Sequence, residues 1–375
     1  MSDKELNLPF YARSSIFFVG IFVLVAMLYI AQGIIVPIVF SILLAILLQP
    51  VMNFFVRLKI NRVIAIAITL VLTLLVIAAF GAFLFSQASR FSESWPILVD
   101  KFTMIINDTT LWASEYFDIK PRNIHNWIIK TKGELINTSG AAIGQTLLTV
   151  GNAIVVLFLI PLYIFLMLFY QPLLIDFIHK LFAEIHQSQV SAIVTQTKTV
   201  VQRYLFGLVI EAFMVATMNS VALLILGIDY AILLGILGAL LNMIPYIGGI
   251  VAVALPMMIA IVTKSTAWYA LYVLAAYYFI QLVDNNYIVP KIVASKVKIN
   301  ALFSIIVVLA GNALWGIPGM FLSIPLLAIV KLIFDHIEPL KPWGFLLGDT
   351  MPSLLKIKPI LKIKPILKNQ KRKPL

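Results

Sequence analysis

The chain of 375 residues is 62% hydrophobic and only 12% charged, and its mean hydropathy is +1.03. A soluble domain is about 45–50% apolar and about 25% charged, so this composition excludes a soluble globular protein and indicates one that lies largely in a lipid bilayer. The absence of cysteine excludes disulfides and thiolate metal sites, and most of the net charge of +12 lies in the last 20 residues. A basic tail behind membrane spans favours a lipid surface over nucleic acid as its partner.

Residues 1–86 are predicted to form three transmembrane helices. A charged side chain at the centre of a membrane helix costs about 2.5–3.5 kcal/mol, so stretches without charge mark the spans. No charged residue lies between Arg13 and Arg57, and this stretch has room for two spans of about 20 residues each. The third span lies between Arg62 and Arg90. The first apolar stretch lacks a small-residue cleavage site, so we expect it to remain in the mature protein.

The next three segments alternate between the membrane surface and its interior. Residues 87–145 hold six basic and six acidic side chains with interleaved aromatic residues, which predicts an extracytoplasmic module of amphipathic helices. Residues 146–171 are predicted to form the fourth transmembrane helix. Residues 172–203 place apolar side chains such as Leu174 and Leu181 at helical spacing, which predicts a cytoplasmic interfacial helix. Packing of this helix against a neighbouring subunit is the alternative.

Residues 204–335 are predicted to form a C-terminal membrane bundle that contains two broken segments. Residues 230–263 and 299–330 carry no charge, and each is too long for one helix and too short for two full spans. Each also has glycine and proline near its middle. Helix-breaking residues at membrane depth are tolerated where the backbone is buried in protein or lines a cavity, and such helices often build transporter binding sites. We interpret the two segments as re-entrant hairpins or as pairs of short helices joined by an ordinary turn.

Positive charges in the short loops predict the orientation of the spans. Arg57 and Arg62 flank one short loop, and Lys291 and Lys298 follow a later span. By the positive-inside rule both loops lie in the cytoplasm, together with the basic tail over residues 336–375 and the N-terminus. The expected fold is therefore an all-α polytopic membrane protein with about eight membrane segments, two of them broken, and a small helical soluble insert.

Ionisable residues within the spans are the first candidates for function. Glu211 interrupts an otherwise apolar span, and Asn219 lies about two turns further along the same face. Glu211 could instead be protonated, or lie near the interface with its carboxyl group in water. Asp284 precedes two asparagines, and this group offers oxygen ligands for a proton or a small cation. The alternative is a helix terminus that faces water.

The two broken segments supply the remaining candidates. Asn242 and Asn312 each precede a helix break and are polar groups at membrane depth. The complete predicted transport pathway consists of Glu211, Asn219, Asn242, Pro245, Gly248, Gly249, Asp284, Asn285, Asn286, Asn312, Gly316, Pro318 and Gly319.

The sequence lacks the usual motifs of enzymes and ATP-driven pumps. It has no phosphate-binding glycine loop, no Gly-x-Ser-x-Gly and no histidine spacing typical of metal sites. We therefore expect no catalytic residue, cofactor or metal site, and we expect any active transport to use an ion gradient.

Three motifs resemble one known family. They are Asn-Met-Ile-Pro-Tyr-Ile-Gly-Gly at residues 242–249, Asn-Tyr-Ile-Val-Pro-Lys-Ile at 286–292, and Gly-Ile-Pro-Gly-Met-Phe-Leu-Ser-Ile-Pro-Leu at 316–326. With the layout of spans, they make about residues 10–340 similar to the AI-2E family of permeases. The family's usual Pro-Tyr-x-Gly-Pro reads Pro-Tyr-Ile-Gly-Gly here, so Gly249 replaces a proline.

The resemblance implies a homo-oligomeric permease of the bacterial inner membrane. Family members are associated with export of the autoinducer-2 signal and others with sodium or lithium/proton antiport. The leading expectation is a permease for a small polar solute, such as an autoinducer-2-like signal, and a monovalent cation/proton antiporter is the alternative. From another class, the chain could be a membrane scaffold or regulator that acts through residues 87–145.

Overall fold

The computed structural model describes residues 9–117, 158–182, 187–244, 248–293 and 299–349. Its elements are α1 (Phe10–Ile30), α2 (Gln32–Arg57), α3 (Arg62–Phe117), a helix over Phe158–Phe169, α5 (Gln171–Leu181), α6 (Gln187–Ile225), α7 (Ala231–Asn242), α8 (Gly248–Thr263), α9 (Trp268–Val283), the π-helix η2 (Asp284–Val293), α10 (Ala301–His336), the 3₁₀ helix η4 (Glu338–Leu340) and α11 (Lys341–Leu347). Within these ranges the β structure amounts to an isolated antiparallel bridge between Ile299 and Gly348.

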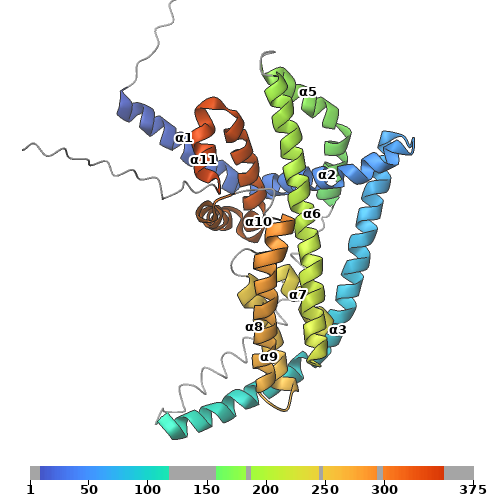
Figure 1. The fold of residues 1–375 in the computed structure, drawn as a ribbon, viewed down its shortest axis with the longest axis vertical. Helices are drawn as coiled ribbons and strands as arrows, with labels where there is room; N and C mark the ends of the chain where they lie inside the picture. Colours follow the sequence, from blue (N-terminus) through green and yellow to red (C-terminus); the bar gives the residue numbers. More distant parts are fainter. Residues whose placement is uncertain (1–8, 118–157, 183–186, 245–247, 294–298, 350–375) are drawn as a thin grey trace, which may run out of the picture.

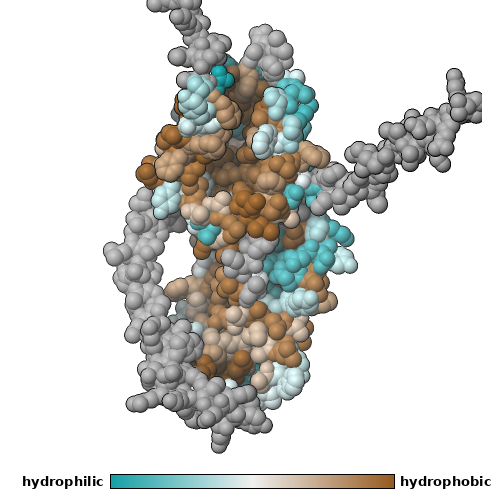
Figure 2. All heavy atoms as spheres, turned by 90° about the vertical axis from the view of Figure 1, so that its left-hand side faces the viewer, coloured by the Kyte–Doolittle hydropathy of each residue, from teal (hydrophilic) through white to brown (hydrophobic). Residues whose placement is uncertain are grey.

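The described helices have the length and apolarity of membrane spans. Among the described residues, five helices can cross a membrane, namely α1, α2, α3, α6 and α10, and a sixth span results if Phe158–Phe169 and α5 count as one bent helix. Figure 2 shows apolar side chains over most of the face drawn, with hydrophilic ones gathered near one end and in a patch at one side. The prediction of an all-α polytopic membrane protein is therefore confirmed.

Helix α3 is longer than the third span that the charge pattern predicts. It continues from Arg62 to Phe117, so the predicted end of the third span at residue 86 lies inside this helix. Figure 1 shows that the helix bends where its colour passes from blue-cyan into teal. Residues 118–157, which include the rest of the predicted insert and the start of the fourth span, lie outside the described residues.

Prolines inside membrane helices free backbone carbonyls, and side chains from other helices bond them. Pro172 has no N–H for the Leu168 carbonyl one turn earlier, and this carbonyl accepts a hydrogen bond from Arg62 Nη2 at 2.7 Å. The chain bends by 62° there, between Phe158–Phe169 and α5. These contacts support the general rule that a break in a membrane helix is tolerated when protein groups satisfy it.

A bundle of four helices forms the centre of the molecule. In Figure 1, α6 runs down the long axis beside α9, and α7 and α8 pack between α6, α3 and α9. Close packing of α6 on α7 depends on Gly235, because a Cβ there would lie 2.6 Å from the Ser220 backbone nitrogen. Fully buried aliphatic side chains, among them Leu223 and Ile259, fill the space between these helices.

Both broken segments fold into pairs of short helices. α7 and α8 contact each other across their break, where a Cβ on Gly248 would lie 1.9 Å from the Leu241 carbonyl oxygen. α10 consists of two arms that meet at Gly316, whose backbone has φ 64° and ψ −143°, a conformation that glycine adopts without strain. At a rise of 1.5 Å per residue, the α7 helix is only about 18 Å long, shorter than the hydrocarbon core of about 30 Å.

The two arms of α10 pack against each other beside the break. A Cβ on Gly311 would lie 2.5 Å from the Gly319 carbonyl oxygen, so only glycine allows this approach. The Ser323 hydroxyl lies 2.6 Å from the Gly319 carbonyl in its own arm and donates across to the Val307 carbonyl at 2.9 Å. A second pairing across the arms therefore lies about one turn beyond the glycines.

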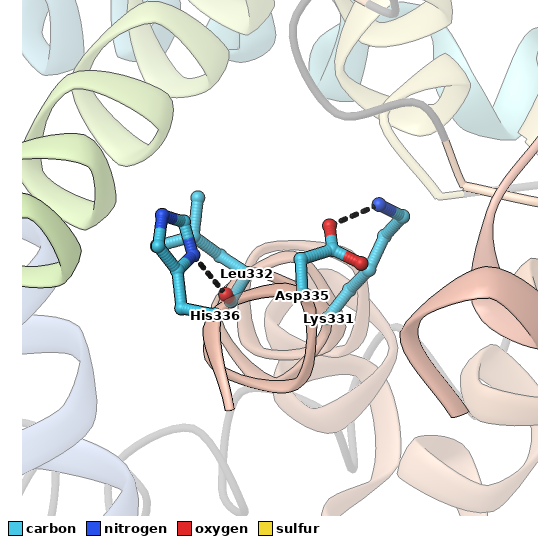
Figure 3. Close-up of polar contacts among 4 residues, drawn as sticks. All are labelled: Lys331, Leu332, Asp335 and His336. Carbon is cyan, nitrogen blue, oxygen red and sulfur yellow. Dashed lines mark hydrogen bonds and ion pairs between the residues drawn. The ribbon is translucent and has the colours of Figure 1, made fainter. Parts of the chain in front are cut away.

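The segment after α10 returns to the start of α10 and holds both of its ends. The Asn300 backbone N–H donates to the Leu347 carbonyl at 2.9 Å. At the other end, α11 lies so close that a Cβ on Gly344 would be 2.3 Å from Asp335 Oδ1. Figure 3 shows this last turn of α10, where Lys331 pairs with Asp335 at 2.6 Å and His336 bonds the Leu332 carbonyl at 2.8 Å on the opposite side of the helix. These contacts fix the ends of the broken helix.

Candidate functional site

Helix α6 buries two polar side chains on the face that it turns into the bundle. Glu211 is 8% exposed and Asn219 is 3% exposed. They share that face with Tyr204 because residues seven or eight apart lie about two turns along the same side of a helix. The prediction that Glu211 and Asn219 share one helix face is thus realised, and both side chains are inside the protein.

Asp284 lies at the junction between α9 and η2 and is 1% exposed. Its Oδ2 accepts a hydrogen bond from Asn242 Nδ2 at 2.9 Å, and Gln281 Nε2 lies 3.4 Å away on the same oxygen. Its Oδ1 is buried and has no hydrogen-bond partner among the described residues. A buried acceptor without a partner is costly, so the site has unused capacity to bind a proton, a cation or a donor group.

The π-helix explains how a polar group can be turned inward at this point. η2 begins at Asp284 and continues α9 with a wider turn that includes Pro290. π-Helical turns are rare and frequently occur at functional sites. Asp284 is turned into the bundle, whereas the neighbouring Asn285 and Asn286 are exposed. The amide of Asn286 donates to the Leu282 carbonyl in its own helix at 2.8 Å.

Gly249 leaves a space that amide oxygens surround. A Cβ at this glycine would lie 2.8 Å from Gln281 Oε1 and 3.6 Å from Asn242 Oδ1. The Asn242 amide donates to Asp284, while the Gln281 amide lies between Asp284 Oδ2 at 3.4 Å and Asn285 Oδ1 at 3.2 Å. Both amides place their oxygens near the missing Cβ. The site therefore combines one carboxylate with two amide oxygens, a set of hard ligands that suits polar groups and small cations.

Glu211 belongs to the same group of residues. It lies close enough to Asp284 for the two carboxyl groups to interact electrostatically. Helix α7, which packs against α6, contributes Asn242. We call Glu211, Asn219, Asn242, Gln281 and Asp284 the polar seam, a group of polar side chains that α6, α7, α9 and the start of η2 contribute.

The predicted pathway residues lie in three different places in the structure. Glu211, Asn219, Asn242, Gly248, Gly249 and Asp284 gather at or beside the polar seam. Asn285 is exposed at the edge of the seam, where its Oδ1 accepts a hydrogen bond from Gln281 Nε2 at 3.2 Å, and Asn286 and Asn312 are exposed outside it. Gly316, Pro318 and Gly319 form the break in α10, while Pro245 lies outside the described residues.

An apolar cluster lies between the α10 break and the end of α7. Trp315, next to the break, and Met243, at the end of α7, both pack against a cluster that includes Leu208 of α6 and Leu322 of α10. The indole Nε1 of Trp315 donates to the Leu28 carbonyl of α1 at 3.0 Å. The two broken segments therefore contact a common apolar cluster.

Gln281 and Tyr277 are the members of this region that sequence reasoning missed. They precede Asp284 by three and seven residues, so all three lie on one face of the helix. That spacing was the available signal, but neither residue is charged at neutral pH and neither adjoins a glycine or proline break. The Tyr277 side chain is 7% exposed, and its hydroxyl oxygen has no hydrogen-bond partner in the described part of the chain.

Comparison with known proteins places most of the chain in one family. A family model described as "AI-2E family transporter" matches residues 17–338. The chain is 25% identical over 324 residues to "AI-2 transport protein TqsA" of Escherichia coli (strain K12), covering 85% of this chain and 90% of that protein. It is 22% identical over 335 residues to "Putative transport protein YhhT" of the same organism, covering 88% and 92%.

A third relative matches over a shorter region. "Putative transport protein YrrI" of Bacillus subtilis (strain 168) is 26% identical over 133 residues, which cover 36% of this chain and 37% of YrrI. The chain thus aligns with little more than a third of this relative. The family model, by contrast, covers the helices from α1 to α10. The protein is a multi-pass bacterial membrane protein and belongs to the AI-2E transporter family.

Proposed function

We propose that the protein is a secondary permease that moves a small polar solute across the bacterial inner membrane along the polar seam, without nucleotide hydrolysis. The observation that most supports this proposal is the burial of Asp284. Its side chain is 1% exposed, and one of its carboxylate oxygens has no hydrogen-bond partner among the described residues. A polar group held in this way inside a membrane bundle has a high free-energy cost and is expected where a solute or ion binds.

An autoinducer-2-like signal is the first solute to test. The relative TqsA is named an AI-2 transport protein, and the match covers 85% of this chain. The polar seam offers both donors and acceptors, since the amides of Asn242 and Gln281 can rotate to suit hydroxyl or carbonyl groups.

Monovalent cation/proton antiport is the second candidate. It is favoured by the amide oxygens of Gln281 and Asn242 near the missing Cβ of Gly249, next to the free oxygen of Asp284. Carboxylate and carbonyl oxygens are the ligands that hard cations prefer. The nearby Glu211 carboxyl group would then offer a second place for a proton.

We infer the arrangement in the membrane from exposed faces together with loop charges. On α5, Leu173, Phe177 and Leu181 are exposed on one face, which supports a place at the membrane surface. Helix α1 has no buried residue and leaves its apolar surface for lipid or for a second copy of the chain. We propose a homo-oligomer with both termini in the cytoplasm, as the positive loops predict.

A flux assay tests these proposals together. The purified protein is reconstituted into phosphatidylethanolamine/phosphatidylglycerol liposomes, and uptake of sodium, lithium, an autoinducer-2 preparation, ribose and inositol is measured. The permease proposal predicts flux of at least one neutral solute above that of empty liposomes. Sodium or lithium flux coupled to internal pH identifies the antiporter. If none of these solutes or ions crosses the membrane, the transport proposal is contradicted, and the hypothesis of a scaffold that acts through residues 87–145 remains.

A further inference from the structure

Tyr277 carries a second buried polar group without a partner, about two helical turns from Asp284. The side chain is 7% exposed, and its hydroxyl oxygen has no hydrogen-bond partner in the ranges that the structure describes. Across the bundle, Asn219 of α6 is 3% exposed. At 1.5 Å per residue, the seven positions between Tyr277 and Asp284 correspond to about 10 Å along the helix.

The hydroxyl of Tyr277 and the amide of Asn219 converge on one point of α7. A Cβ on Gly238 would lie 3.1 Å from Asn219 Nδ2 and 3.3 Å from Tyr277 Oη. The nearest obstacles at Gly238 are thus the ends of two polar side chains. At Gly235, one turn earlier, a Cβ would meet both the hydroxyl oxygen and the backbone of Ser220. Close helix packing therefore accounts for Gly235, whereas Gly238 allows the ends of two polar side chains to reach the α7 backbone.

Packing alone gives no reason for a tyrosine at this position. Phenylalanine would fill almost the same volume and would avoid the free-energy cost of burying a hydroxyl group without a hydrogen bond. A buried tyrosine usually finds a partner for its hydroxyl. A hydrogen-bond partner that binds transiently would account for the tyrosine, and a transported solute is such a partner.

The polar group around Tyr277 and the polar group around Asp284 lie in one row along the bundle. Tyr277, Gln281 and Asp284 share a face of α9 and its continuation, and Gly238 and Asn242 are one turn apart on α7. Asn219 and Glu211 lie two turns apart on the facing side of α6. Asn219 and Tyr277 meet at Gly238, and Glu211 lies two turns from Asn219 within electrostatic reach of Asp284, so the row has two levels.

We propose that Tyr277 and Asn219, which converge at Gly238, form a second solute-binding position in the pathway, which hydrogen-bonds a hydroxyl or carbonyl group of a neutral polar solute. This inference rests on the proposed function and narrows its substrate class. The hydroxyl of Tyr277 can donate to a solute oxygen, and the amide of Asn219 can donate and accept. A solute with several hydroxyl groups can bind the Asp284 level and the Tyr277 level in turn.

The test compares Tyr277→Phe with Tyr278→Phe in the liposome assay with ribose, inositol and sodium. Tyr278 is the next residue and is 66% exposed, so its replacement controls for loss of a tyrosine hydroxyl at the lipid-facing side. Tyr277→Phe is expected to melt at the same or a higher temperature than the wild type. It is also expected to lower flux of the hydroxylated solute about tenfold, the change that loss of one hydrogen bond produces. Gly238→Ala, whose methyl group would press on the ends of Asn219 and Tyr277, should lower the same flux.

The outcomes separate this inference from the proposed function. Loss of flux in Asp284→Asn but wild-type flux in Tyr277→Phe overturns the second position and leaves the permease intact. A lower melting temperature for Tyr277→Phe also overturns it, because the hydroxyl would then have a structural role. Wild-type flux in Asp284→Asn overturns the proposed pathway and the second position with it.

Discussion

Replacing Asp284 with asparagine is expected to lower transport at least about tenfold while the protein still folds. Asparagine has the same shape, and its side-chain oxygen can still accept the hydrogen bond that Asn242 Nδ2 makes to Oδ2 at 2.9 Å. What is lost is the charge at a site that is 1% exposed. A hydrogen bond to a charged group is worth about 1.5–3 kcal/mol, which corresponds to a change of about ten- to a hundredfold.

The measurement is flux in liposomes together with the melting temperature of the purified variant. Asp229→Asn is the matched control, because Asp229 is an exposed carboxylate in the loop between α6 and α7. The control should keep both flux and melting temperature. Unchanged flux in Asp284→Asn would remove this carboxylate from the transport pathway.

The adjacent glycines Gly248 and Gly249 are expected to respond differently to replacement by alanine, the first by losing folded protein and the second by losing transport. In Gly248→Ala, the new methyl group would lie 1.9 Å from the Leu241 carbonyl oxygen, a backbone atom that cannot move without opening the α7–α8 pair. Overpacking of this kind costs about 1–3 kcal/mol and occasionally more. We expect a large loss of folded protein and a lower melting temperature for this variant.

In Gly249→Ala, the methyl group would meet Gln281 Oε1 at 2.8 Å. This atom is the end of a flexible side chain and can rotate away, so the fold should remain. The Gln281 amide would then leave Asp284 Oδ2, from which it lies 3.4 Å away, and transport should fall several-fold. Size-exclusion chromatography and flux separate the two effects. Equal loss of folded protein in both variants would show that Gly249 serves packing alone.

The distribution of charge predicted where α2 ends and α3 begins. Charges are costly inside a bilayer, so Arg57 and Arg62 lie at the ends of helices α2 and α3, as the charge-free stretches predict. Glycine and proline also marked the two breaks, because Gly316 adopts a backbone conformation that few other residues tolerate. These features depend on single residues, and a sequence displays them directly.

The arrangement of the polar seam depends on which helix faces meet, and that is decided by packing. Asn312 is polar and precedes a break, but its face of α10 is exposed. Gln281 and Tyr277 are uncharged and lie in an apolar helix, so they are recognised only once α9 is placed beside α6 and α7. The pairing of Gly311 with Gly319 likewise depends on how the two arms of α10 meet.

Cysteine labelling tests the central claim, that the polar seam lines the transport pathway, most directly. The chain has no cysteine, so a single substitution can be labelled without a background. Gln281→Cys replaces a side chain in the polar seam, and Phe279→Cys, on the same helix, replaces one that is 65% exposed on the apolar surface. A small water-soluble thiol reagent should label Gln281→Cys in liposomes and block its flux. An excess of transported solute should protect this cysteine from labelling, while Phe279→Cys stays unlabelled. Failure to label Gln281→Cys, or labelling that leaves flux unchanged, would contradict a pathway along the polar seam.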